Sequence, residues 1–233
     1  MSSSAAIDAR TSFSGRFRRG LVAASDSDPF FLPSRSLLAS FDNGCAEEVI
    51  SIAAICQVNS IFNYARSATQ VSERDIAIAD LVHPTGDHMT FARIFANDDW
   101  KDANACSEMY LNQRALRKAD EVRQQLRGFM RRLGSVSRLP SVGTEGDREV
   151  SLILKSLVKG HVFNCARMGT DGKYRTLRGS NVVDVCATSL FGRFGKYSEY
   201  VIFSYTEDSA KTLGNLQIVN VSAVDGNWLL GNR

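Results

Sequence analysis

With 233 residues, 44% of them apolar and 23% charged, the chain is long enough to bury one or two ordinary hydrophobic cores. Its apolar runs are far shorter than a bilayer crossing, which excludes a membrane-spanning protein, and its five cysteines contain no CxxC pair, which indicates a reducing, intracellular compartment. The net charge of +3 is too small to indicate nucleic-acid binding by itself, so the distribution of charge along the chain must decide.

The first 29 residues differ in composition from the rest of the chain. They are rich in Ser, Ala and Arg, contain few large apolar residues and show no helical or strand period, so we predict a disordered leader over residues 1–29. Arginine and serine are also typical of a mitochondrial transit peptide, which is the alternative. The acidic residues Asp8, Asp26 and Asp28 argue against it, because transit peptides are poor in acids.

From residue 30 to about 140 the pattern predicts a helical bundle. A short apolar run covers residues 36–40, and a helix begins near Glu47, where negative charge suits a first helical turn, and runs to about Val58. This helix is apolar on nearly every side and should lie at the centre of the core. Further helices are predicted over 72–81 and 89–95, with Trp100 as a core anchor.

The stretch HPTGDHMTF, residues 83–91, places two of the chain's three histidines beside an aspartate. Imidazole nitrogen and carboxylate oxygen both ligate zinc, so a metal site is one interpretation. The spacing argues against it: Pro84 and Gly86 predict a turn between the rings, Asp87 suits the N-cap of a helix beginning at His88, and no further Cys or His lies nearby. The spacing therefore predicts no metal site here.

The longest predicted helix runs from Asn112, which suits an N-cap, to Gly134, which suits a stop. At about 100° per residue its apolar side chains form one stripe, and four arginines lie on the opposite face with Arg127 at the flank. The stripe comprises Leu116, Ala119, Val122, Leu126, Phe129, Met130 and Leu133, and the arginines are Arg114, Arg117, Arg131 and Arg132. Such a face is either an ordinary solvated surface, with Asp120 and Glu121 as local ion-pair partners, or a phosphate-binding surface.

Residues 138–147, RLPSVGTEGD, contain Pro140 and two glycines among small polar residues and mark the clearest internal boundary. A helix is predicted over 149–159. After it come short β-prone runs separated by turn residues: KYRTLRG, NVVDVCAT, EYVIFSYT and LQIVNVS. Residues 224–230 are predicted to form a short final helix. The fold class is therefore α+β and multidomain, with a helical bundle followed by a small five-stranded β-barrel.

Seven sequence blocks stand in a recognisable order from about Phe30 to the C-terminus. They are SLLASFDNGCAEEVISIAAICQVNSIF, HPTGDHMTFARIF with Trp100, YLNQRALRKADEVRQQL, ILKSLVKGHVFNCAR, KYRTLRG, EYVIFSYT and VDGNWLL. Together they resemble the C-terminal half of a DEAH-box RNA helicase. The resemblance implies a ratchet-like helicase-associated helical domain over residues 30–140 and an oligonucleotide/oligosaccharide-binding (OB) fold over 141–233, with HPTGDH as a structural corner.

The resemblance also implies a function in RNA metabolism. The family unwinds RNA by ATP-driven 3′-to-5′ translocation, in pre-mRNA splicing or ribosome biogenesis, which implies a nuclear location. The chain would act as an accessory module beside RecA-like helicase domains, and its barrel would dock glycine-patch activator proteins. Such a chain is either an independent accessory protein or part of a complete helicase.

The chain departs from the family in lacking the ATPase motifs. No GxxxxGK[ST] loop and no DEAH tetrapeptide occur, and GTDGK and GRFGK have the wrong spacing to hold phosphate. We also expect no winged-helix segment in this chain, because the Ser/Arg-rich leader stands where the family has that segment before the ratchet-like domain. We therefore expect no cofactor in this chain, whereas ATP and Mg²⁺ belong to the complete family helicase, and we expect no ATP hydrolysis by the chain alone.

Two kinds of function follow from these patterns. In the first, the chain binds single-stranded RNA without sequence preference, with Tyr174 stacking on a base unless its ring fills the barrel core. The predicted RNA-binding residues are Arg114, Arg117, Arg131, Arg132, Lys159, Arg167, Lys173, Tyr174 and Arg175. In the second, the same surfaces bind a protein, such as a glycine-patch activator.

Overall fold

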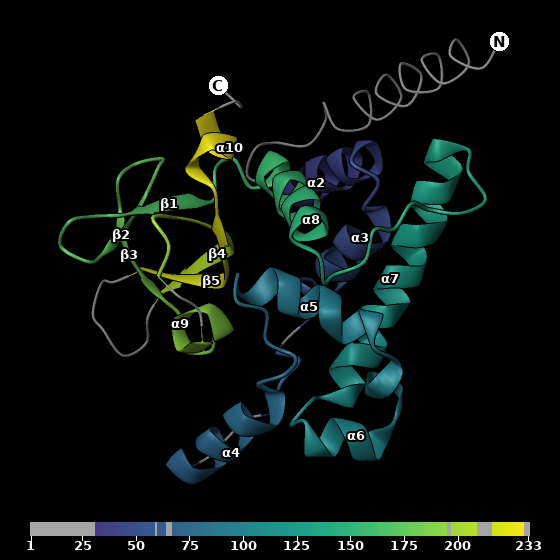
Figure 1. The fold of residues 1–233 in the computed structure, drawn as a ribbon, viewed down its shortest axis with the longest axis horizontal. Coiled ribbons are helices and arrows are strands. Elements are labelled where there is room, and N and C mark those ends of the chain that lie inside the picture. Colours follow the sequence, from purple (N-terminus) through teal and green to yellow (C-terminus); the bar gives the residue numbers. More distant parts are fainter. Residues whose placement is uncertain (1–30, 59, 64–66, 195–196, 209–215, 231–233) are drawn as a thin grey trace.

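The computed structural model describes residues 31–58, 60–63, 67–194, 197–208 and 216–230 (Figure 1). The predicted leader lies outside this part of the chain. Helices form one side of the molecule and a small barrel forms the other, with the long helix α7 (Gln113–Gly134) at the edge farthest from the barrel. This architecture confirms the predicted α+β fold of a helical bundle followed by an OB-like barrel. No helix within the described residues combines the length and apolar character needed to cross a membrane.

The helical bundle is built around α3 (Ala46–Ile55), which packs against α5 (Asp87–Ala96) and α7. Val49, Ile50 and Ile52 on α3 are almost completely buried, which confirms the central position predicted for this helix. The other helices of the bundle are α2 (Phe31–Asp42), α4 (Ala68–Ile78), the 3-10 helix η1 (Asp98–Lys101), α6 (Ala103–Glu108) and α8 (Asp147–Gly160). The apolar run over 36–40 is thus part of a longer helix, and α6 is an element that the sequence pattern did not predict.

Trp100 in η1 is the core anchor that the sequence predicts. Its side chain is 4% exposed and packs edge to face against Phe95, with the ring centroids 5.2 Å apart. The Cys106 thiol donates to the Trp100 carbonyl oxygen, which joins α6 to η1. Because burial of a large apolar side chain contributes about 1.5–3 kcal/mol, this cluster anchors the η1–α6 segment to the bundle.

The helix α7 begins and ends where the sequence predicts. The Asn112 side chain accepts the backbone N–H of Ala115, which confirms the predicted N-cap. The helix ends at Gly134, and Ser135 then takes a left-handed conformation with φ of 51°. The left-handed residue after the helix is therefore a serine, whose N–H pairs with a carbonyl oxygen of the last turn.

The buried face of α7 differs from the predicted stripe at two positions. Phe129 is 44% exposed, whereas Arg123 is buried. The helical period explains both, because Leu116, Arg123 and Met130 recur every two turns at the centre of the buried face, and Phe129 lies at its edge. Arg123 therefore takes a buried position that the predicted stripe leaves out, and its guanidinium group lies over the Phe95 ring of α5.

The barrel is closed, with its five strands in the order β1-β2-β3-β5-β4. The strands are β1 (Cys165–Met168), β2 (Tyr174–Thr176), β3 (Val182–Val185), β4 (Tyr200–Asp208) and β5 (Leu216–Val224), followed by helix α10 (Gly226–Leu230). Strands β3 and β5 pair in parallel, and the other neighbours pair antiparallel. Each of the four predicted β-prone runs coincides with a strand, although β4 and β5 each extend two residues beyond the predicted run, whereas β1 and helix α9 (Leu190–Phe194) were not predicted.

The bundle and the barrel share part of one core. Val150, Ile153 and Leu157 on α8 belong to the helical core, together with Cys165 and Ile202 from the barrel strands. A second, smaller core lies inside the barrel. Because the apolar contacts continue from the helices into the barrel, they do not mark where one domain ends and the next begins. The domain boundary at residue 141 therefore stays a prediction.

Candidate functional site

The HPTGDH stretch forms a corner that joins the bundle to the barrel. Gly86 pairs with Ser222 of β5 in an isolated β-bridge, and the Ala223 N–H donates to the Thr85 carbonyl oxygen at 2.8 Å. Gly86 has φ of 117° and ψ of −153°, and a Cβ placed on it would lie 2.4 Å from the Val221 carbonyl oxygen. A residue with a side chain does not fit this conformation at such a close approach, so the corner requires glycine.

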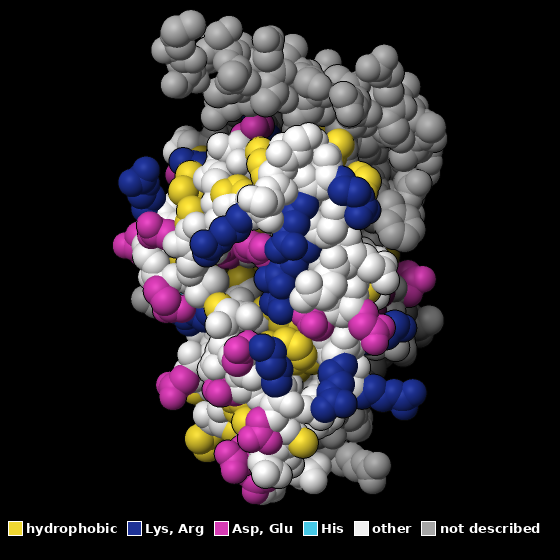
Figure 2. Space-filling model, turned by 90° about the vertical axis from the view of Figure 1, so that its right-hand side faces the viewer, with side chains coloured by type: hydrophobic (Ala, Val, Ile, Leu, Met, Phe, Trp, Pro, Cys, Tyr) yellow, Lys and Arg dark blue, Asp and Glu magenta, His cyan; other side chains and the backbone are white. Residues whose placement is uncertain are grey.

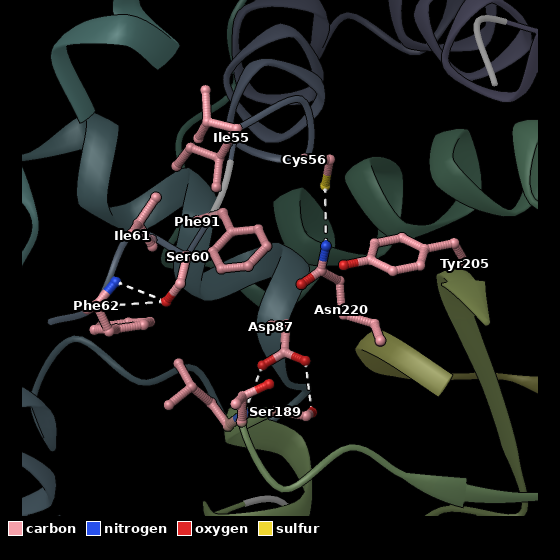
Figure 3. A pocket seen from close by; sticks show the side chains of 14 residues that line it. Ile55, Cys56, Ser60, Ile61, Phe62, Asp87, Phe91, Ser189, Tyr205 and Asn220 are labelled. Carbon is pink, nitrogen blue, oxygen red and sulfur yellow. Dashed lines mark hydrogen bonds between the residues drawn. The ribbon is translucent and has the colours of Figure 1, made fainter. Parts of the chain in front are cut away.

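Asp87 binds the corner to the barrel through its carboxylate. It accepts the Ser189 hydroxyl at 2.6 Å and the Leu190 N–H at 2.7 Å (Figure 3). It also accepts the Val221 N–H at 2.6 Å. Burial raises the pKa of this carboxyl, and these three donors, together with the Phe191 backbone N–H, oppose the rise. The predicted N-cap role is wrong, because Gly86 holds the N-cap position and Asp87, the first residue of α5, directs its side chain to the barrel.

The two histidines of the corner are packed and hydrogen-bonded, as the structural interpretation predicts. The backbone N–H of His88 donates to the Ser222 hydroxyl, and the ring Nδ1 atom of His88 lies 2.9 Å from the same oxygen. Burial lowers the pKa of His88, and burial lowers the pKa of His83 to about 4. Both rings are therefore neutral near pH 7, which suits hydrogen bonding to hydroxyls inside the joint.

A small cavity of about 220 Å³ lies beside the corner, between the end of α3, α5 and the barrel (Figure 3). Cys56 lies on its wall, with the Asn220 Nδ2 atom 3.8 Å from its sulfur. Burial raises the pKa of the Cys56 thiol to about 11, so the group is protonated near neutral pH. Since the reactive form of cysteine is the thiolate, the Cys56 thiol is not an activated nucleophile.

The arginines predicted on the outer face of α7 are all exposed. They are Arg114, Arg117, Arg131 and Arg132. Among the described residues, none of the four has an ion-pair or hydrogen-bond partner. Figure 2 shows the side of the molecule that carries α7, where Lys and Arg side chains gather with acidic side chains between them. These guanidinium groups are accessible to an anionic ligand.

The basic residues predicted on the barrel side are also at the surface, where Arg167 and Arg175 form ion pairs. Arg167 forms an ion pair with Glu199 at 2.9 Å, and Arg175 forms one with Asp171 at 2.7 Å. Lys173 and Lys159 are exposed. Because the barrel and α7 lie at opposite ends of the molecule (Figure 1), the structure does not bring the two predicted sets of basic residues to one surface.

Tyr174 belongs to the barrel core, which corrects its predicted use as a stacking platform. Its side chain is 3% exposed, and its hydroxyl donates to the Ser198 carbonyl oxygen at 2.7 Å. A ring buried in this way presents no face to a base. Tyr197, which is 74% exposed, instead lines a shallow groove of about 460 Å³ on the barrel together with Lys173 and Arg193.

Three further arginines, outside the predicted site, line a groove of about 400 Å³ between α3, α5, α7 and residues 138–144. They are Arg123, Arg127 and Arg138, and we call this groove the arginine groove. The Arg123 guanidinium carbon lies 4.2 Å from the centroid of the Phe95 ring, and the group pairs with Asp120 at 2.7 Å. Burial and the neighbouring Arg127 lower the pKa of Arg123.

Glu48 holds the segment that closes the arginine groove. Its Oε1 atom accepts the Ser141 hydroxyl at 2.5 Å, the Val142 N–H at 3.1 Å and the Gly143 N–H at 2.9 Å. Its Oε2 atom is buried and has no hydrogen-bond partner among the described residues. Leaving a buried acceptor unpaired costs about 1–3 kcal/mol, so this oxygen is an unusual feature of the groove.

Residues 32–91 match the family described as helicase associated domain (HA2), ratchet-like. This match covers α2 to the first half of α5, including the HPTGDH corner. The fold and the match together define a ratchet-like helicase-associated domain followed by an OB-like barrel. The chain belongs with the C-terminal region of the DEAH-box RNA helicases.

Similar proteins extend this relationship over most of the chain. The chain is 30% identical over 215 residues to the Homo sapiens protein "Probable ATP-dependent RNA helicase DHX35", a match that covers 90% of the chain and 28% of the relative. It is 31% identical over 202 residues to the Schizosaccharomyces pombe protein "Pre-mRNA-splicing factor ATP-dependent RNA helicase prp22", covering 84% of the chain and 16% of the relative. The chain thus spans less than a third of the length of either relative.

Proposed function

We propose that the chain is an accessory module of a DEAH-box RNA helicase and that it binds single-stranded RNA without sequence preference. The observation that carries the proposal is the similarity to an ATP-dependent RNA helicase over 90% of the chain. The named pre-mRNA-splicing relative favours splicing as the pathway and the nucleus as the location. RecA-like helicase domains are then the expected partners, since ATP-driven unwinding requires them.

Exposed basic side chains at both ends of the molecule support this proposal. On α7, the side chains of Arg117 and Arg131 have no protein partner among the described residues, and on the barrel Lys173 lines the same groove as the exposed Tyr197. Phosphate contacts from such groups give sequence-independent affinity, and an exposed aromatic ring gives each stacked base about 1–3 kcal/mol. The exposed ion pairs of Arg167 and Arg175 can exchange their carboxylate partners for phosphate.

Reversing the charge of Arg117 and Arg131 together is expected to weaken RNA binding by at least roughly tenfold at low salt. Affinity for a labelled single-stranded RNA would be measured by fluorescence anisotropy over a series of salt concentrations. The slope of the logarithm of the association constant against the logarithm of the salt concentration should also become less steep by about 0.7 for each lost phosphate contact, because fewer counterions are released.

The matched control replaces the same two arginines by lysine, which keeps the positive charge and should keep most of the affinity. If Arg117→Glu with Arg131→Glu binds RNA as tightly as the native chain while circular dichroism shows the native fold, the α7 surface does not bind RNA. That result would favour the other function, in which the α7 face and the barrel dock a protein such as a glycine-patch activator.

The purified chain is expected not to hydrolyse ATP, with or without single-stranded RNA. The sequence contains no phosphate-binding GxxxxGK[ST] loop and no DEAH tetrapeptide, and phosphoryl transfer depends on such groups to position the nucleotide and its metal. Phosphate release would be measured at saturating RNA. RNA-stimulated turnover that co-purifies with the chain through successive columns would contradict this expectation.

A further inference from the structure

The cavity beside the HPTGDH corner, which we call the joint cavity, has a buried apolar interior and an open mouth. Its buried apolar lining comes from both the bundle and the barrel and comprises Ile55, Ile61, Phe91, Leu190 and Val219. At the mouth, Ser60, Thr188 and Tyr205 are exposed to solvent. A ligand can therefore enter from solvent and reach the apolar interior.

The size and charge of the joint cavity restrict its ligand to one small neutral group. An apolar cavity of about 150 Å³ holds a benzene ring, so a volume of about 220 Å³ accommodates a single aromatic heterocycle. Among the described residues that line it, Asp87 alone is charged, and both of its carboxylate oxygens already accept donors from the barrel half. A phosphate group or a metal ion therefore finds no available countercharge on this wall.

Asn220 and Tyr205 place polar groups on the wall of the joint cavity that bond weakly or not at all to the protein. The Asn220 Nδ2 atom lies 3.4 Å from the Ser204 hydroxyl oxygen, which is a long hydrogen bond, and the carboxamide oxygen has no donor among the described residues. The Tyr205 hydroxyl also lacks a partner in this part of the chain, and its side chain is 48% exposed. Figure 3 shows both side chains directed into the space beside the Phe91 ring.

These features together define the chemistry of the ligand. A carboxamide offers a donor and an acceptor side by side, so it matches a flat ring that carries an acceptor and a donor on one edge. A nucleobase has such a pair on its Watson–Crick edge, and proteins recognise the unstacked bases of single-stranded RNA through stacking and through this edge. An aliphatic side chain of a protein partner would fill the interior but would leave the carboxamide unpaired.

We propose that the joint cavity takes up one unstacked base of a single-stranded RNA, with the ring beside Phe91 and the Watson–Crick edge on the Asn220 carboxamide and the Tyr205 hydroxyl. The inference rests on the proposed RNA-binding function and adds a physical reason for selecting single strands, because in a duplex this edge is paired and the base is stacked. Each of the four RNA bases carries an adjacent donor and acceptor on this edge, so the cavity requires no particular sequence.

The first test compares two labelled strands of equal length on the full chain: oligouridine, and a ribose-phosphate strand that is abasic at every position. Both carry the same phosphates, so a base-binding cavity predicts roughly a tenfold tighter binding of oligouridine by fluorescence anisotropy. Equal affinities overturn the inference and leave the proposed RNA-binding function intact. Absence of binding to both strands removes both.

A substitution at the mouth separates the joint cavity from other places where a base could stack. Thr188→Trp adds a large ring at an exposed lining position, so the preference for oligouridine should fall to about threefold or less while the affinity for the abasic strand stays the same. The matched control is Thr170→Trp at an exposed position between β1 and β2, which should keep the full preference. An unchanged preference in Thr188→Trp overturns the inference.

A second variant tests the polar edge. Asn220 has φ of 54°, a left-handed conformation that aspartate also tolerates, so Asn220→Asp keeps the backbone and an oxygen but removes the amide donor. The preference for oligouridine should again fall to about threefold or less, whereas the exposed control Asn181→Asp should keep it. The added charge repels both strands equally, and the preference is a ratio measured on one sample, so neither repulsion nor partial unfolding changes it. An unchanged preference in Asn220→Asp contradicts the assigned contact.

Photocrosslinking locates the bound base directly on the native chain. A strand that contains 4-thiouridine would be bound and irradiated, and the crosslinked residues would be identified by mass spectrometry. The inference expects crosslinks to residues that line the joint cavity, such as Phe91 or Tyr205. Crosslinks confined to other surfaces, such as α7 or the groove at Tyr197, overturn it and would leave a protein side chain as the occupant of the cavity.

Discussion

Replacing Asp87 by alanine is expected to lower the free energy of unfolding by roughly 3–5 kcal/mol, because three buried donors lose their acceptor at once. Two of them are backbone N–H groups, of Leu190 and Val221, and the third is the Ser189 hydroxyl. All three belong to the barrel half, so the substitution weakens the joint between the two halves. Urea unfolding followed by circular dichroism would measure the change.

The control for this substitution is Asp80→Ala, which removes the same atoms from an exposed position after α4. It should change the free energy of unfolding by less than about 0.5 kcal/mol, as surface substitutions generally do. Since native proteins are stable by only about 5–15 kcal/mol, the Asp87 variant should be close to its unfolding limit at ambient temperature. A loss similar to that of Asp80→Ala would show that the carboxylate does not hold the barrel.

The helical period of apolar residues in the sequence correctly predicted those helices whose stabilising contacts lie within a single segment. The apolar residues of α3 and the caps of α7 predict those helices correctly, because a helical face and its end residues can be read within one segment. Strand β1 could not be recognised in this way, since Cys165–Met168 is short and has no β-branched side chain. Its strand conformation depends on pairing with β2 and β4.

Two errors, one in the predicted buried face of α7 and one in the predicted site, could have been avoided by applying the same periods more strictly. Arg123 lies two turns from both Leu116 and Met130, so its place on the buried face follows from the helical repeat. In β2, strand alternation puts Tyr174 and Thr176 on one side and Arg175 on the other, and the first two are buried. The period therefore favours Tyr174 in the barrel core.

The partners of Asp87 and Glu48 could not be predicted from local pattern. Ser189 and Val221 are separated from Asp87 by 102 and 134 residues, and Ser141 is 93 residues from Glu48. Such contacts arise only when the barrel or the 138–144 segment has folded against the bundle. An acidic residue at a helix start has a sufficient local explanation as a cap or a dipole charge, and this explanation conceals the long-range role.

Replacing Gly86 by alanine is expected to lower the free energy of unfolding by roughly 3–5 kcal/mol, through backbone strain and steric overlap together. The backbone φ of 117° lies outside the region that side chains tolerate, and the added Cβ would lie 2.4 Å from the Val221 carbonyl oxygen and 3.1 Å from the Phe191 Cβ atom. The overlap of the added Cβ atom with Val221 and Phe191 can be relieved only if β5 and α9 move away from the corner. That movement would also disturb the donors that Asp87 accepts.

A second glycine separates the two causes. Gly172 has φ of 75°, also a left-handed conformation, but a Cβ there would meet no atom within 4 Å. Gly172→Ala should therefore lose only the backbone contribution, about 1–2 kcal/mol. Both variants would be compared by urea unfolding of the full chain, and the excess loss for Gly86→Ala reflects the close approach to β5 together with the greater backbone strain at φ of 117° and ψ of −153°. Equal losses for the two variants would show that the corner relaxes freely, in which case the joint between the ratchet-like bundle and the barrel is not fixed by this contact.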